Sequence, residues 1–280
     1  MGRTNSVVAV WTKGVARVRV RTLSLAVLSF LVLTGCSPSS SSNPPTKLTV
    51  LAASSLTKVF PQIGAQFTKS HPDVTFSFSF GGTDQLAAQI QQGAPADVFA
   101  GASTKYGDQL AGANQIEPYA IFCTNQLVLI TPASNPASIT SLKDLTKKGV
   151  KLVIGSETVP VGSYTRTVLA NLDATYGAGY STKVLANVVS NEDAVSSIVT
   201  KVVSGEADAG FVYITDSLAA GSQVNTITLP ADAQAIASYP IAVVSASEHQ
   251  TPAKQFADFV LTPAAQQLLA DAGFGPPPSS

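Results

Sequence analysis

The sequence contains few of the residues that most often carry catalysis, metals or disulfide bonds. Its 280 residues include only two cysteines, two histidines, one tryptophan and one methionine. Two cysteines cannot build a disulfide framework, and no Cys or His spacing typical of a zinc site is present. Walker, GxGxxG and GxSxG motifs are also missing. We therefore expect neither an enzyme nor a cofactor.

Charged residues are sparse as well, at 12% of the chain, and they are unevenly distributed. The five charges in residues 1–35 are all basic, so the remainder has 12 basic residues against 17 acidic ones, a net charge of −5. An acidic chain without basic runs is not typical of proteins that bind nucleic acid or adsorb broadly to anionic membranes. An anionic ligand would have to be held by local dipoles.

Residues 1–35 have the composition of an export signal. A basic stretch precedes the apolar run Leu23–Leu33, which is shorter than the ~20 residues of a membrane-spanning helix. The following LTGC sequence, ending at Cys36, resembles the bacterial lipobox, whose cysteine is acylated and becomes the new N-terminus. The sequence thus predicts a lipoprotein signal peptide over 1–35 and a Ser/Pro-rich tether over 36–46 after lipidated Cys36. An ordinary signal peptide with a chance cysteine is the alternative.

From Lys47 onward, short β-rich runs alternate with helical patterns, which predicts an α/β fold with largely parallel strands. Strands are expected near 48–53, 74–80, 97–101, 120–131, 151–155, 209–213, 224–229 and 239–244. Helices are expected at 56–69, becoming regular only at Pro61, and at 192–204. A closing helix pair, 253–261 and 264–272, precedes a tail, 275–280, predicted to be disordered. Cys123 lies in an apolar stretch and is expected to be buried.

Residues that offer hydroxyl or backbone N–H hydrogen-bond donors follow several of the predicted strands. Ligands of open α/β sheets bind beyond the carboxyl ends of strands, where helix N-termini present free N–H groups to anions. Each junction alone has a plainer interpretation as a helix cap or a tight turn. The junctions are AASSL (52–56), FGGTD (80–84), VPVGSY (159–164), NEDA (191–194) and Tyr213.

Six segments in order resemble the molybdate-binding proteins of ABC importers, over about residues 47–274. They are LAASSLTKVFPQIGAQF, SFGGTDQLAAQIQQGAPADVFAGA, SETVPVGSYTRTVL, SNEDAVSSIV, GEADAGFVYITDS and YPIAVV. The resemblance implies a type II periplasmic-binding-protein fold, in which two lobes joined by two crossing strands clamp the ligand. One lobe would comprise residues 47–122 plus 239–280, the other residues 123–238, with crossings near Cys123 and Tyr239.

Carried over position by position, the resemblance also implies five oxyanion-binding residues. The donors would be the hydroxyl and N–H of Ser55, the Thr83 hydroxyl, the backbone N–H groups of Val161 and Ala194, and the Tyr213 hydroxyl. Thr83 stands where the family usually has serine and keeps the donor. Asp84 departs from the family pattern, because a carboxylate would repel a dianion. We expect it to turn outward and cap its helix.

The function implied by the resemblance is that of a monomeric receptor, anchored by lipid outside the cytoplasmic membrane, that delivers molybdate or tungstate to an importer permease. Receptors for sulfate, an iron-chelate anion or another small anion remain alternatives, as does a non-transport oxyanion sensor. A surface hydrolase is a further alternative, which would need Ser55 or Ser163 beside one of the two histidines.

Overall fold

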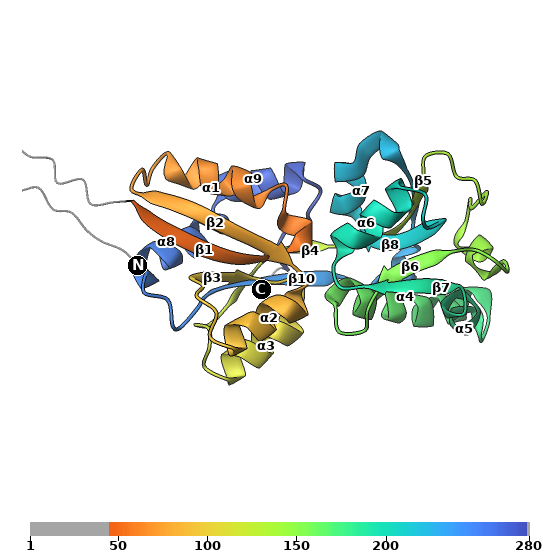
Figure 1. Ribbon diagram of the computed structural model, residues 1–280, viewed down its shortest axis with the longest axis horizontal. Coiled ribbons are helices and arrows are strands. Elements are labelled where there is room, and N and C mark those ends of the chain that lie inside the picture. The colour runs from red at the N-terminus through yellow and green to blue at the C-terminus, as the bar shows by residue number, and fades with distance from the viewer. Residues whose placement is uncertain (1–44, 279–280) are drawn as a thin grey trace, which may run out of the picture. The chain divides into compact units, whose positions relative to one another are not determined.

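The computed structural model describes residues 45–278. The predicted signal peptide and Cys36 lie outside these residues, as does almost all of the predicted tether. The described chain forms two five-stranded sheets, each covered by helices on both faces (Figure 1). The predicted α/β class is therefore confirmed. Among residues 45–278, no helix is both long and apolar enough to cross a membrane.

The first sheet has the strand order β2-β1-β3-β10-β4. Strand β10 is antiparallel to both of its neighbours, whereas the other four strands run in one direction. The strands are β1 (Thr46–Ala53), β2 (Val74–Gly81), β3 (Val98–Ala100), β4 (Ala120–Asn125) and β10 (Ala237–Val243). The helices are α1 (Phe60–Thr68), α2 (Thr83–Gln91), α3 (Thr104–Gly112), α8 (Gln250–Val260) and α9 (Pro263–Asp271). We call this sheet with its helices the first lobe.

The second sheet, with its helices, forms the second lobe and has the order β7-β6-β8-β5-β9. Here β5 is the single reversed strand. The strands are β5 (Leu127–Pro132), β6 (Leu152–Gly155), β7 (Val188–Glu192), β8 (Ala209–Tyr213) and β9 (Val224–Thr228). The helices are α4 (Pro160–Tyr176), α5 (Tyr180–Leu185), α6 (Val195–Val203) and α7 (Ile214–Ala220). Short 3₁₀ turns occupy Ser54–Leu56, Leu142–Thr146, Gly221–Gln223 and Ala231–Ala233.

The chain crosses between the sheets twice at neighbouring places. It leaves the first sheet after Asn125, at the end of β4, and returns to it at Ala237, which pairs with Asn125. The single strand predicted over 120–131 is therefore wrong. It is two strands in different sheets, divided at Gln126 where the chain changes sheets.

Buried apolar faces fix the helices against the sheets, as the sequence periodicity predicts. The apolar face of the 56–69 segment is at most 1% exposed. Its regular helix, α1, has Pro61 in the first turn, which confirms the predicted irregular start. Its buried residues are Leu56, Val59, Phe60, Ile63 and Phe67. Cys123 is fully buried as predicted, and burial raises the pKa of its thiol well above the ordinary value.

Two further predictions are wrong for local physical reasons. Strand β7 was not expected, because it lies at the edge of the second sheet and its sequence VVSNE has no continuous apolar run. The tail predicted as disordered is ordered over Gly275–Pro278. Gly275 exchanges two backbone hydrogen bonds with Thr124, whose hydroxyl also donates to the Pro276 carbonyl.

Candidate oxyanion site

Four of the five predicted site residues line one narrow cavity between the lobes. Ser55 lies in the 3₁₀ turn after β1, and Thr83 is the first residue of α2 after β2. Val161 lies in the first turn of α4, and Tyr213 is the last residue of β8. Ala194 does not itself line the cavity. It is the N-cap residue of α6, whose first residue, Val195, does.

The cavity is small and uncharged. It encloses about 10 Å³ of free space, close to the room needed for one water molecule. The twelve described residues that line it are Ala53, Ser54, Ser55, Gly81, Gly82, Thr83, Ala102, Val159, Pro160, Val161, Val195 and Tyr213. Because none of them is charged, any anion held here must be held by N–H and O–H dipoles.

Three helices, α2, α4 and α6, begin at this cavity. The first N–H groups of a helix have no partner within it, and the helix dipole makes that end attractive to anions. Pro160 occupies the first position of α4, so the N–H of Val161 is the first that this helix can offer. The first turns of α4 and α6 contain no acidic residue. The backbone thus supplies donors from both lobes.

The Thr83 side chain lines the cavity, and its hydroxyl donates no hydrogen bond to the described residues. The side chain is 1% exposed, and its oxygen accepts a hydrogen bond from the backbone N–H of Ala102 at 3.1 Å. Since the oxygen already accepts from the protein, the hydroxyl proton remains available for a ligand acceptor.

The hydroxyl of Tyr213 is a buried donor for which the protein provides no acceptor among the described residues. The residue is 2% exposed, and its hydroxyl has no hydrogen-bond partner among the described residues. Burial raises the pKa of this phenol well above its ordinary value, so it stays a neutral donor. A buried hydroxyl without a partner costs about 1–3 kcal/mol. An acceptor brought into the cavity would remove that cost.

Asp84 does not cap its helix as predicted. Its carboxylate instead accepts a hydrogen bond from the Thr158 hydroxyl of the second lobe at 2.8 Å, and it is not among the cavity-lining residues. Asp84 is thus held by the second lobe, and the predicted partner, the start of its own helix, is wrong. Tyr106 of the first lobe donates to the carbonyl of the same Thr158. These two contacts join the lobes beside the cavity.

The lobes also meet at Gly82, directly before α2. A β-carbon at this position would lie 2.2 Å from the carbonyl oxygen of Asp193 in the second lobe. Only glycine permits this approach of two backbones.

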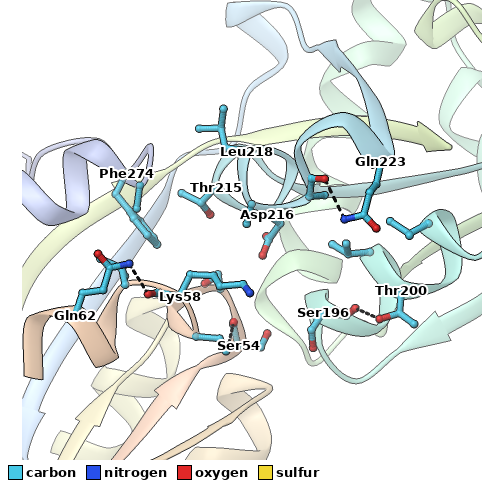
Figure 2. A pocket seen from close by; sticks show the side chains of 18 of the residues that line it. Ser54, Lys58, Gln62, Ser196, Thr200, Thr215, Asp216, Leu218, Gln223 and Phe274 are labelled. Carbon is cyan, nitrogen blue, oxygen red and sulfur yellow. Dashed lines mark hydrogen bonds between the residues drawn. The ribbon is translucent and has the colours of Figure 1, made fainter. Parts of the chain in front are cut away.

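A much wider groove of about 850 Å³ lies beside the cavity, between α1 and α9 of the first lobe and α6 and α7 of the second (Figure 2). Its lining is largely apolar and includes Leu218, which is 59% exposed, together with Lys58 and Asp216. Ser55 borders both spaces. The groove offers no converging set of donors and is far larger than a tetrahedral anion needs, so the narrow cavity is the better candidate.

Neither histidine is placed to support the alternative of a serine hydrolase. His71 Nδ1 lies within hydrogen-bond distance of the Ser70 hydroxyl and the Phe67 carbonyl. His249 Nδ1 lies 3.1 Å from the carboxylate of Asp97. Ser55 contacts Tyr239 instead of a base. Within residues 45–278, no group of Asp, Glu, His and Cys side chains is arranged to hold a metal ion.

Comparisons with known proteins agree with this architecture. Residues 48–275 match the family model described as bacterial extracellular solute-binding protein. The molybdate-binding protein ModA of Mycobacterium tuberculosis is 36% identical over 266 residues, covering 91% of this chain and 98% of that protein. The putative ABC transporter substrate-binding lipoprotein YvgL of Bacillus subtilis is 30% identical, with 89% and 95% covered.

Among solved structures, the periplasmic molybdate-binding protein of Azotobacter vinelandii superimposes with a TM-score of 0.72 at 23% identity, covering 82% of this chain and 100% of that one. At this identity the likeness concerns the fold, and it confirms the predicted two-lobed periplasmic-binding-protein architecture. The predicted family resemblance and the non-enzymatic class are confirmed by the sequence relatives. The chain belongs to the bacterial extracellular solute-binding protein family.

Proposed function

We propose that this protein captures molybdate outside the cytoplasmic membrane and delivers it to an ABC importer. The observation that carries the proposal is the unpartnered Tyr213 hydroxyl, buried at an uncharged cavity where three helices begin. The M. tuberculosis relative named as a molybdate-binding protein supports the choice of ligand.

Neutral donors suit a fully deprotonated tetrahedral anion. Such an anion has only acceptors, and N–H and O–H groups satisfy all of them without adding charge to the site. A ligand that retains a proton would bury that proton without an acceptor, which costs about 1–3 kcal/mol. On this basis the site discriminates against monoprotonated phosphate. Tungstate, which shares the charge and shape of molybdate, is expected to bind as well.

We propose that the two lobes move about the two crossings to admit the ligand. They were expected as residues 47–122 plus 239–280 and residues 123–238, and the chain changes sheets close to those bounds, after Asn125 and before Ala237. The site donors come from both lobes, so an anion between them stabilises the closed arrangement over the open one. The small cavity volume supports this proposal, because a space for about one water molecule admits a four-oxygen anion only when the lobes separate, and they must then close around it less tightly than in this structure. The permease would then recognise the closed form.

We also propose that the protein is a monomer anchored to the outer face of the cytoplasmic membrane through a lipid on Cys36. The basic and apolar composition of residues 1–35 and the LTGC sequence support the anchor. A Cys36→Ser variant should lose incorporation of a labelled fatty acid, whereas Cys123→Ser should retain it. Labelling that persists in Cys36→Ser would contradict the anchor.

The experiment that tests the proposed function is calorimetric titration of residues 47–280 with molybdate, tungstate, sulfate and phosphate. We expect tight binding of molybdate and tungstate, reduced about 10- to 100-fold in Ser55→Ala by loss of a charge-assisted hydrogen bond. Lys58→Ala, which alters only the wide groove, should bind like the wild type. Preferential binding of sulfate would correct the ligand, and binding of no oxyanion would refute the function.

A further inference from the structure

A buried chain of polar groups leads from the cavity to the two crossings between the lobes. The Tyr239 side chain on β10 is 0% exposed, and its hydroxyl lies 2.9 Å from the Ser55 hydroxyl, 184 residues away in sequence. Asn125, at the end of β4, is 1% exposed and places Nδ2 3.4 Å from the same Tyr239 oxygen. β4 and β10 are neighbouring strands (Figure 1). Their pairing brings Tyr239 and Asn125 together.

The amide of Asn125 has a fixed orientation. Its Oδ1 accepts from the backbone N–H of Gln126 at 3.0 Å, and its Nδ2 donates to the Thr215 hydroxyl of α7 at 2.9 Å. The Nδ2 group therefore faces Tyr239, and an amide NH₂ donates but does not accept.

This orientation favours one arrangement of the hydroxyl protons. The Tyr239 hydroxyl lies 2.9 Å from Ser55 Oγ and 3.4 Å from the NH₂ group of Asn125, and of these two groups Ser55 Oγ is the one that can accept. When Tyr239 donates to Ser55, the Ser55 oxygen is occupied as an acceptor. The Ser55 proton is then free to point into the cavity that this residue lines.

We infer that Tyr239, oriented by Asn125, is a positioning residue that fixes the Ser55 hydroxyl as a donor and thereby helps the site to select fully deprotonated oxyanions. The inference rests on the proposed oxyanion-binding function. Without Tyr239, Ser55 could rotate and present a lone pair to the cavity. That lone pair would repel a fully deprotonated anion and accept the proton of a monoprotonated one. Burial raises the pKa of the Tyr239 phenol well above its ordinary value, so the donor persists at neutral pH.

The first test is a double-mutant cycle on molybdate affinity. Tyr239→Phe should weaken binding about three- to ten-fold, the range of one neutral hydrogen bond. In a Ser55→Ala background, the same substitution should have no further effect, because Tyr239 acts through the missing hydroxyl. The exposed Tyr176→Phe is the matched control and should bind like the wild type. Equal losses from Tyr239→Phe in both backgrounds would overturn the positioning role.

The second test reverses the direction of the chain. In Asn125→Asp the amide donor becomes a carboxylate, which accepts a hydrogen bond from the Tyr239 hydroxyl, so that Ser55 donates to the Tyr239 oxygen. Affinities for molybdate and for monoprotonated phosphate are compared at alkaline pH, where both ligands are dianions. The ratio of the two affinities therefore cancels the repulsion that the new charge exerts equally on both dianions. We expect the preference for molybdate to fall by about ten-fold or more in Asn125→Asp and to fall also in Tyr239→Phe.

The exposed Asn114→Asp introduces the same charge away from the site and should keep the wild-type preference. An unchanged preference in both Asn125→Asp and Tyr239→Phe would overturn the inference, even if both variants bind more weakly. Wild-type protein that binds no oxyanion would instead refute the proposed function itself. Melting temperatures of the variants identify any loss that is due to unfolding.

Discussion

Replacement of Tyr213 by phenylalanine should separate stability from binding. The substitution deletes only the hydroxyl, which is buried and has no partner among the described residues. Burying such a group unpaired costs about 1–3 kcal/mol, and its deletion leaves no other described group unpaired. We therefore expect the free energy of unfolding of ligand-free Tyr213→Phe to equal or exceed that of the wild type.

The same substitution should weaken oxyanion binding strongly. A hydrogen bond from the neutral phenol to an anionic oxygen contributes about 1.5–3 kcal/mol, which corresponds to a loss in affinity of about 10- to 150-fold. Urea unfolding of the free protein and calorimetric titration with molybdate measure the two effects on the same preparation.

Tyr180 provides a matched control for this prediction. It is also buried, but its hydroxyl donates to the Leu142 carbonyl at 2.7 Å. Tyr180→Phe removes this hydrogen bond and should lower the free energy of unfolding by about 1 kcal/mol without changing molybdate affinity. A Tyr213→Phe variant that is destabilised while binding molybdate normally would show that the Tyr213 hydroxyl has a partner within the protein and none in the ligand.

Three further predictions concern closure and pH. Gly82→Ala would place a β-carbon against the Asp193 carbonyl. Calorimetry should show a molybdate affinity reduced about ten-fold or more, with little change in melting temperature. Normal affinity would show that the lobes need not approach this closely. Thr158→Val removes the hydrogen bond to Asp84 and should weaken molybdate binding about three-fold. Stopped-flow measurements should show more rapid dissociation of molybdate. An unchanged dissociation rate would show that this contact does not stabilise the closed form. Burial raises the pKa of Asp216 from 3.8 to about 7, so the folded chain binds more protons than the unfolded chain between about pH 4 and 7, and stability falls as pH rises through this range. Unfolding midpoints of Asp216→Asn should lose this dependence, and a profile that matches the wild type would argue against the raised pKa.

The sequence was sufficient to predict most elements because their physical signals are local. Short apolar runs specify buried strands, and the burial of Leu56, Ile63 and Phe67 follows from their helical spacing. The junction of β2 with α2 was foreseen from paired glycines followed by a small hydroxyl, and the Thr83 hydroxyl lies at the cavity. Such signals require no knowledge of how distant segments meet.

Contacts between distant segments could not be predicted in this way. The hydrogen bond between Asp84 and Thr158 joins residues 74 apart, and that between Ser55 and Tyr239 joins residues 184 apart. Both depend on how the lobes approach each other, and nothing in the local sequence indicates that approach. The FGGTD segment suggested a helix cap for Asp84 because that is the usual role of an aspartate at a helix start.

An oxyanion should occupy the narrow cavity and not the wide groove. A crystal structure of the protein grown with molybdate can show this, because the molybdenum is located by its anomalous scattering. We expect one strong peak between the lobes, with anion oxygens within hydrogen-bond distance of the hydroxyls of Ser55, Thr83 and Tyr213. A peak in the groove beside Lys58, or none between the lobes, would contradict it.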